Sequence, residues 1–373
     1  MSPFRGPRRA RRYHPLPGSH PGPFSSCGLH EVRQAVGGII PPHMLRELAQ
    51  RGTPMQRARA LNTLIHTEQL RGQRDILSLL TTTTPAGQKQ RTIYDAQHAS
   101  QLPGRLVRAE GAPKVADRAV NEAYDYAGVV YDFCRVVLGR NSIDDRGLRL
   151  DASVHYGVAY DNAFWNGTQM VYGDGDGEIF QRFTKSLEVI GHELTHGITQ
   201  YEAALDYRGQ SGALNESFSD VVGVLVKQWK LGQTAAEADW IIGADLLAKG
   251  VHGVGIRSLK SPGSAYDDPR LGKDPQPAHM KQYCSDVADN GGVHLNSGIP
   301  NHAFYLAAVS LGGHAWEAAG TIWYNALCHR LRPQSRFAEA AHATSSVAGE
   351  LFGVRSREQR AVQTAWQMVG VIK

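Results

Sequence analysis

The spacing of apolar residues changes part-way along the chain. Segments 104–111, 148–167 and 168–183 alternate apolar and polar residues between Gly/Asp turns, which is typical of strands. Residues 117–139, which lie between them, repeat their apolar positions with a helical period. From Leu187 onward the pattern predicts helices at 186–201, 212–230, 235–249, 297–312, 314–331, 336–350 and 356–369. A strand-rich lobe followed by a helix-rich lobe predicts an α+β fold, with any site in the cleft near helix 186–201.

The first 90 residues differ from the rest. Residues 1–30 contain the basic run "RGPRRARR" and read as a disordered tail. Pro41 and Pro42 suit a helix start, and Met44, Leu45 and Leu48 form an apolar stripe. The polar stretch "TTTTPAGQKQR" reads as a linker. We therefore divide the chain into a tail (1–30), a leading segment with linker (31–90), a strand-rich lobe (91–200) and a helical lobe (201–373).

Composition excludes several classes of protein. No run of 18 apolar residues is present, so we expect no membrane span. The formal net charge is +5, but residues 5–12 alone carry five arginines, so the charge gives little support for nucleic-acid binding. Proline, glycine and serine follow that basic run, so no standard secretory signal is recognised. The four cysteines lack CxxC spacing, which argues against a cysteine zinc site or a disulfide scaffold.

Two histidines stand four apart in "EVIGHELTHGITQY" (188–201). On a helix His192 and His196 share one face, and this arrangement suits a tetrahedral zinc ion. Glu193 lies beside the first histidine and can reach a water on the metal without binding the metal itself. The HExxH pattern alone is moderately specific, because a surface helix with two solvated histidines would also produce it.

A second segment, "SGALNESFSDVVGVLV" (211–226), carries two carboxylates on one face of an apolar helix. Buried carboxylates are costly unless they are paired or bind a metal. Glu216 can supply a third zinc ligand, Asp220 can accept a hydrogen bond from His192, and Asn215 can serve His196 similarly. The alternative is that both carboxylates face water. Three protein ligands and a water describe a catalytic zinc ion rather than a structural one.

"HELTH" followed by "GALNESFSD" resembles the thermolysin family of zinc endopeptidases. The 19 residues between His196 and Glu216 fit that family better than the aminopeptidases that share the two-helix zinc design. Segments 160–177 and 289–305 extend the resemblance, which covers the chain from about residue 91. "TIYDAQ", "LPG", "VRAEG" and the leader with "PPHML" resemble the protealysin-type subgroup. The resemblance implies a thermolysin-like two-lobe fold and a short propeptide that blocks the cleft and is removed.

The resemblance also implies a catalytic set. Glu193 would act as the general base that takes a proton from water and later passes it to the amine. His294 would stabilise the oxyanion, with Asp289 holding its imidazole and Tyr207 assisting.

By the same resemblance, the Asn162 side chain and the Ala163 carbonyl grip the substrate backbone, and Trp165 lines the cleft. Arg257 would contact the carbonyl next to the cleaved bond. An apolar pocket would select Leu, Ile, Val or Phe on the amine side of the cleaved bond. The alternative for its wall residues is ordinary packing in the hydrophobic core. Those four residues are Phe180, Val189, Ile242 and Ile256.

Thermolysin-like enzymes often hold a double calcium site beside the zinc. Glu188 and Asp239 occupy two of its positions, but Lys227, Ile241 and Ala244 stand where calcium-rich members have glutamates. Calcium prefers six to eight oxygens, so we expect the double site to be absent and Lys227 to pair with Asp239 or Glu188. "GDGDGE" (173–178) fits a calcium loop or a hairpin turn equally well.

The sequence therefore predicts a monomeric zinc endopeptidase that acts on peptides or proteins and is inhibited by its own propeptide. Zinc is the one cofactor expected. The alternative is a catalytically idle zinc protein of the same fold that binds peptides. The resemblance implies secretion, while the unrecognised signal leaves a cytoplasmic location open.

Overall fold

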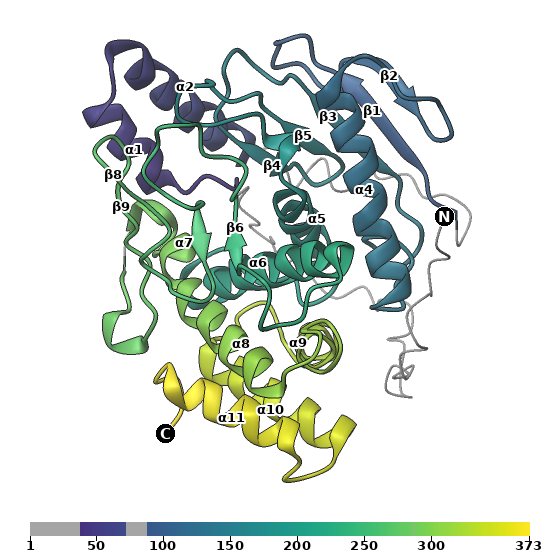
Figure 1. Cartoon of the computed structure of the whole chain (residues 1–373), viewed down its shortest axis with the longest axis vertical. Helices are drawn as coiled ribbons and strands as arrows, with labels where there is room; N and C mark the ends of the chain where they lie inside the picture. The colour runs from purple at the N-terminus through teal and green to yellow at the C-terminus, as the bar shows by residue number, and fades with distance from the viewer. Residues whose placement is uncertain (1–37, 72–87, 286) are drawn as a thin grey trace, which may run out of the picture. The chain divides into compact units, whose positions relative to one another are not determined.

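The computed structural model describes residues 38–71, 88–285 and 287–373 (Figure 1). The predicted disordered tail (1–30) and most of the predicted linker lie outside the described residues. Among the described residues, no helix combines the length and apolar character needed to cross a bilayer.

The first lobe is built on a five-stranded sheet with the order β2-β1-β3-β5-β4. The central pairs β1–β3 and β3–β5 are parallel, whereas β2 and β4 pair antiparallel at the two edges. Helix α4 (Arg118–Val136) covers the sheet, and its first turn is capped by the Asp117 carboxylate. The strands are β1 (Arg91–Asp95), β2 (Arg105–Ala109), β3 (Leu150–Val154), β4 (Ala163–Trp165) and β5 (Met170–Tyr172).

Two long helices lie between the sheet and the C-terminal helices (Figure 1). Helix α5 (Leu187–Tyr201) is buried over almost its whole length, and α6 (Gly209–Leu231) packs along it. Glycines allow this close approach: a Cβ on Gly191 would lie 3.1 Å from the Cα of Gly223, and one on Gly223 would lie 2.5 Å from the Glu188 carbonyl oxygen. The close contact brings the polar faces of α5 and α6 together.

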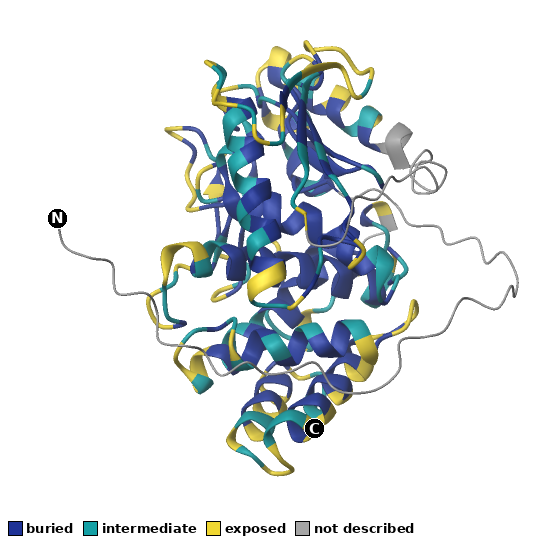
Figure 2. Ribbon diagram, turned by 90° about the vertical axis from the view of Figure 1, so that its right-hand side faces the viewer, coloured by how far each residue is buried: buried dark blue, intermediate teal, exposed yellow. Residues whose placement is uncertain are grey.

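The second lobe is helical after residue 292. Figure 2 shows the buried residues of these helices facing inward and the exposed ones on their outer faces and loops. The α+β prediction is therefore confirmed. The helices are α7 (Val293–Asn296), α8 (Gly298–Leu311), α9 (Ala318–His329), α10 (Phe337–Phe352) and α11 (Arg357–Met368).

The helix predicted at 235–249 is wrong. That segment forms turns and the two-residue strand β6 (Ile241–Ile242), which pairs with β7 (Arg257–Ser258). Gly243 has a φ of +72°, which a right-handed helix does not allow, and the Glu188 carboxylate accepts hydrogen bonds from the backbone N–H groups of Gly243 and Ala244. The segment has helical apolar spacing, but its backbone groups bond to a side chain from α5 instead. A second short hairpin follows, β8 (Asp267–Asp268) and β9 (Gly272–Lys273).

The leading segment forms helices α1 (Pro42–Arg51) and α2 (Pro54–Arg71). As predicted, α1 begins at the prolines and buries Met44, Leu45 and Leu48. The apolar residues Ile39 and Ile40 precede it and are also buried in the main hydrophobic core. The leader is therefore packed against the rest of the protein rather than separated from it.

Candidate active site

The two histidines of α5 are fixed by acceptors on α6. His192 Nδ1 lies 2.8 Å from Asp220 Oδ1, and His196 Nδ1 lies 2.8 Å from Asn215 Oδ1. A carboxylate or amide oxygen can only accept, so each Nδ1 carries the proton. The neutral form of each ring then presents an unprotonated Nε2 toward its neighbour.

These Nε2 atoms require a cation between them. They lie 3.1 Å apart, and Glu216 oxygens lie 3.5 Å from each of them. Glu216 Oε2 is buried and has no hydrogen-bond partner within the described residues. Two lone pairs and a carboxylate repel one another in the absence of a positive charge. Zinc–nitrogen bonds of 2.0–2.1 Å at a tetrahedral angle place two imidazole nitrogens about 3.3 Å apart, so this donor set fits zinc.

Glu193 lies on the same face of α5, next to the first histidine. Its side chain is fully buried, and Oε2 accepts a hydrogen bond of 3.1 Å from the backbone N–H of Trp165. This bond ties the carboxylate to the edge strand β4. Glu193 therefore lies between the proposed metal ligands and the strand edge.

A second histidine system approaches from α7. His294 Nδ1 lies 2.6 Å from Asp289 Oδ1, and its Nε2 lies 3.2 Å from the Tyr207 hydroxyl, which donates a hydrogen bond to Glu216. Burial alone would lower the pKa of His294, but the carboxylates of Glu216 and Asp289 raise it above its usual range. In the protonated form that this shift favours, both ring nitrogens are donors, and His294 can stabilise negative charge near Glu216.

Asp220 is the centre of a buried polar network. Its carboxylate accepts hydrogen bonds from Arg257 Nε (2.9 Å) and Nη2 (2.8 Å), from Asn301 Nδ2 (2.9 Å), and from His192. Burial alone would raise the pKa of Asp220, but Arg257 and His192 hold it well below its usual range. The pairing of Arg257 with Asp220 was missed by the sequence reasoning, because the two residues are 37 positions apart and on different elements.

The leader lies along the free edge of β4. The Ile39 N–H donates to the Ala163 carbonyl (3.1 Å), and the Ile40 N–H donates to Asn162 Oδ1 (2.9 Å). Arg257 Nη1 donates to the Ile39 carbonyl at 2.9 Å. The leader thus lies along the edge of β4 and bonds to it, in the manner of a bound peptide.

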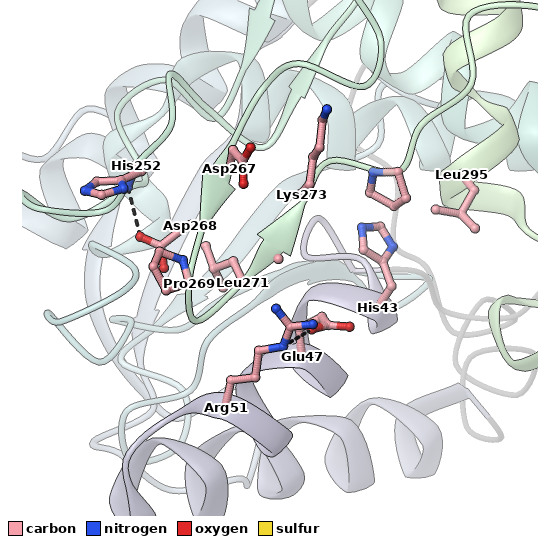
Figure 3. Close-up of a pocket in the computed structure, with 12 residues that line it drawn as sticks. His43, Glu47, Arg51, His252, Asp267, Asp268, Pro269, Leu271, Lys273 and Leu295 are labelled. Carbon is pink, nitrogen blue, oxygen red and sulfur yellow. Dashed lines mark hydrogen bonds and ion pairs between the residues drawn. The ribbon is translucent and has the colours of Figure 1, made fainter.

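Helix α1 forms one wall of a cavity of about 700 Å³ (Figure 3). The view shows His43, Glu47 and Arg51 of α1 facing the β8–β9 hairpin, with Glu47 and Arg51 joined as an ion pair of 2.7 Å. His43 Nε2 hydrogen-bonds to the Tyr266 hydroxyl at 2.9 Å. The cavity therefore separates part of the leader from the catalytic lobes.

Comparison with known proteins decides the family. The model "Thermolysin metallopeptidase, catalytic domain" matches residues 68–200, and "Thermolysin metallopeptidase, alpha-helical domain" matches residues 203–371. The chain belongs to the thermolysin metallopeptidase family. A third model, "Protealysin propeptide", matches residues 37–76. The recognition from "HELTH" and "GALNESFSD" is confirmed, and the chain is a metallopeptidase with a protealysin-type propeptide segment.

Two curated relatives and one solved structure match this chain over most of their own length. The "Extracellular metalloprotease" of Pectobacterium carotovorum subsp. carotovorum is 55% identical over 89% of this chain and 96% of its own. "Protease PrtS" of Photorhabdus sp. is 47% identical over 90% and 92%. The solved "Precursor of Protealysin, Metalloproteinase from Serratia proteamaculans" has a TM-score of 0.84 and 55% identity, covering 90% of this chain and 100% of that one. The thermolysin-like fold is confirmed.

The residues that the resemblance assigns to a double calcium site form an ion pair here. Lys227 Nζ lies 2.9 Å from Asp239 Oδ2 and 3.6 Å from Glu188 Oε1. Burial alone would lower the pKa of Lys227, but Glu188 and Asp239 raise it. A charged lysine therefore lies among these acids, and the absence of the double calcium site stays a prediction.

A second group of potential metal ligands is His98, His155 and Asp174. His155 Nδ1 lies 2.9 Å from Asp174, and its Nε2 lies 2.8 Å from Asp117. Hydrogen bonds to Asp174 and Asp117 raise the pKa of His155 to about 9. At neutral pH the ring is then an imidazolium that joins two carboxylates.

The remaining sequence-predicted residues are placed as follows. Trp165 is fully buried, and its contact with Glu193 is through the backbone. The four residues expected to line the apolar pocket all belong to the main hydrophobic core, so their lining of a pocket stays a prediction. They are Phe180, Val189, Ile242 and Ile256.

Four residues were not predicted. Asn301 lies in segment 289–305, which supported only the resemblance, and Asp161 directly precedes Asn162. Ile39 and Ile40 stand just before the "PPHML" motif of a leader that was expected to block the cleft. This apolar pair was the sequence feature that could have predicted a segment bound at the edge of β4.

Proposed function

We propose that the protein is a zinc-dependent endopeptidase made as a propeptide-inhibited precursor, with the catalytic and binding roles assigned above to each residue. One observation, the meeting of several side chains at one place, carries the proposal. Two unprotonated imidazole nitrogens and a buried carboxylate meet beside Glu193, at a strand edge already occupied by a peptide segment. His192, His196 and Glu216 would hold the ion.

The residues divide the chemical work among them. When bound, zinc supplies Lewis acidity and lowers the pKa of a water molecule toward about 7. Glu193 takes the proton from the attacking water and returns it to the leaving amine nitrogen. His294 and Tyr207 donate hydrogen bonds to the oxygen on which negative charge develops, and Asp289 keeps the imidazole oriented.

The leader marks where substrate binds. Arg257 holds the Ile39 carbonyl, and Ala163 accepts from the N–H of the same residue. Ile39 therefore stands in for the residue on the amine side of the cleaved bond, and Gly38 precedes that bond. An isoleucine at this place supports the preference for Leu, Ile, Val or Phe there.

The same contacts support intramolecular inhibition. A substrate cannot pair with Ala163 and Asn162 while Ile39 and Ile40 hold those groups. Removal of the leader, with a boundary near residue 90, would free the edge of β4. Export is part of the proposal as well, because the relative from Pectobacterium carotovorum subsp. carotovorum is named an extracellular metalloprotease.

Metal removal tests the function. A strong chelator is expected to abolish cleavage of a peptide library by the matured protein, and zinc is expected to restore it at about one ion per chain. Calcium added without zinc should restore no cleavage and should leave the unfolding temperature unchanged, because Lys227 already places a positive charge between Glu188 and Asp239. Cleavage that survives removal of every metal, or that calcium alone restores, would refute the zinc mechanism. A higher unfolding temperature with calcium would refute the loss of the calcium site.

The docking of the propeptide is expected to weaken in acid through His43. Burial lowers its pKa from 6.5 to about 3, opposed by Asp289 and reinforced by His294, Arg46 and Arg257. His43 Nδ1 has no hydrogen-bond partner within the described residues to stabilise a second proton. The released leader would protonate near pH 6.5 and the docked leader would not. Docking is therefore complete above about pH 6.5 and weakens by up to about tenfold per pH unit below it, until about pH 3.

Limited proteolysis of the leader at about pH 7.5 and about pH 5.5 measures this effect. The Glu193→Gln precursor prevents self-processing, and the same precursor with His43→Gln provides the control. The rate of leader cutting relative to the His43→Gln control should rise about tenfold at the lower pH. Equal relative rates at both pH values would exclude His43 as the responsible group.

A further inference from the structure

Asp161 is a buried carboxylate that the proposed mechanism does not use. It directly precedes the substrate-binding residue Asn162 and is fully buried. Within the described residues no side chain donates a hydrogen bond to its carboxylate oxygens, which interact with the backbone N–H of Asp176. Burial and the neighbouring Asp176 raise the pKa of Asp161 well above its usual range. Burying a carboxylate that no cation pairs with costs free energy. We therefore expect another state of the protein to give Asp161 a partner.

Asp161 belongs to a cluster of three acids. The loop after β5 folds back on this segment, with hydrogen bonds from Gly173 N–H to the Asn162 carbonyl (3.0 Å) and from Gly175 N–H to the Tyr160 carbonyl (3.2 Å). One oxygen of Asp176 accepts three backbone N–H groups, and the other is buried with no partner in the part of the chain that is described. The acidic cluster comprises Asp161, Asp176 and Glu178.

Helix α2 of the propeptide covers the acidic cluster. Gln56 Nε2 donates to Glu178 Oε2 at 2.8 Å, and the Asp161 N–H donates to Thr63 Oγ1 at 3.4 Å. Arg59 Nη1 lies 3.9 Å from Glu178 Oε1, and its charge favours ionisation of Asp161. The buried face of α2, formed by Gln56, Ala60 and Thr63, therefore brings Arg59 close to the acidic cluster.

The catalytic lobes supply little charge of their own to balance these acids. Arg270 is close enough for Asp176 and Glu178 to raise its pKa, but its guanidinium is held by Asp268 at 3.0 and 3.1 Å. When the propeptide leaves, Arg59 leaves with it. The acidic cluster is then open and lacks its cation.

The direction of the bound strand places the cluster on the path of a substrate. The Ile39 N–H bonds to the Ala163 carbonyl and the Ile40 N–H bonds to the Asn162 side chain. The contacts thus step back along β4 as the leader advances, so the leader runs in the opposite direction to β4. The position that follows Ile40 on this path lies beside Asp161. The propeptide departs there, because Pro41 and Pro42 turn it into α1. A substrate that stays extended would instead continue beside Asp161, two or three residues after the cleaved bond.

We propose that the acidic cluster is a subsite of the matured enzyme that binds a lysine or arginine side chain two or three residues beyond the cleaved bond. Arg59 occupies this subsite in the precursor. The inference rests on the proposed endopeptidase function and extends it to a class of substrate. An arginine already covers the cluster, which favours a basic side chain over a metal ion as the occupant.

The test compares quenched peptides cleaved by the matured enzyme. The peptides share a leucine after the cleaved bond and carry Arg, Lys, Gln or Asp at the second or third position beyond it. At low ionic strength, kcat/KM is expected to be about tenfold higher for Arg or Lys than for Gln, and lower still for Asp. About 1 M salt should reduce the preference, because it screens the charges.

Variants assign the preference to the cluster. Asp161→Asn keeps the size of the side chain, so it should fold and should reduce the Arg-to-Gln ratio to about twofold or less. Glu178→Gln, at the rim of the cluster, should reduce the ratio less. The control is Glu237→Gln, an exposed acid bonded to Thr234, which should leave the ratio unchanged.

Equal kcat/KM values for Arg and Gln in the wild-type enzyme would overturn the subsite, as would an undiminished ratio in Asp161→Asn. If no peptide of the set is cleaved by metal-loaded, matured protein, the proposed endopeptidase function fails instead. Cleavage of every peptide without regard to charge would leave the endopeptidase function standing and remove only the subsite.

Discussion

Replacing Glu193 with glutamine is expected to leave the protein folded and loaded with zinc, but to lower kcat for peptide cleavage by about 10²- to 10⁴-fold. Glutamine has nearly the same shape, and its amide oxygen can still accept the Trp165 N–H that Glu193 accepts at 3.1 Å. It cannot take a proton from water. The proposed zinc ligands His192, His196 and Glu216 are not altered, so metal content should not change.

The measurement must separate lost chemistry from a propeptide that stays in place. Wild-type and variant precursors are treated with the same unrelated serine protease to cut the leader, and cleavage is then followed with that protease inhibited. Glu237→Gln serves as the matched exchange at an exposed position. If Glu193→Gln retains the wild-type rate, Glu193 is not the base. If the wild-type protein itself cleaves nothing while holding zinc, the catalytically idle peptide-binding protein becomes the better interpretation.

The proposed zinc site was predictable because its spacing is local. His192 and His196 are brought together by one helical turn, and Glu216 and Asp220 by another, so four residues needed only the helical period. The pairing of the two helices was less visible in the sequence. It depends on Gly191 and Gly223, where any larger side chain would push the backbones of α5 and α6 apart.

The failed helix at 235–249 shows the limit of periodicity. Its apolar residues repeat as they do in a helix, and Trp240, Ile242 and Leu246 are indeed buried. Their burial is achieved by strands and turns, because a carboxylate from α5 binds the backbone N–H groups at Gly243 and Ala244. Local spacing does not reveal a partner that is 55 residues away.

The contacts between the propeptide and the cleft could not be predicted from the sequence either. The expectation that the leader blocks the cleft came from resemblance, not from any pattern in residues 38–40. The pairing of Ile39 with Ala163 joins segments that lie far apart in the chain, and it depends on β4 being an edge strand. The edge position follows from strand order, which alternation along a single strand does not determine.

Replacing Asp220 with alanine is expected to damage both stability and zinc binding, for separate reasons. The change leaves the buried guanidinium of Arg257 without its carboxylate, which costs about 3–5 kcal/mol of unfolding free energy. It also removes the acceptor that fixes the proton on His192 Nδ1, which lowers zinc affinity by about 10- to 100-fold. Denaturant unfolding of the metal-free protein measures the first effect, and competition with a chelator measures the second.

Two further variants separate these effects. Asp220→Asn retains an oxygen for His192 but no charge for Arg257, so zinc affinity should fall less than stability does. The double variant Asp220→Ala with Arg257→Met removes both charges and should recover much of the lost stability, because a buried ion pair replaced by apolar groups is often neutral. Its zinc affinity should remain low. Recovery of zinc affinity in the double variant would mean that Asp220 acts through Arg257 rather than through His192, and the role given to its hydrogen bond with His192 would be wrong.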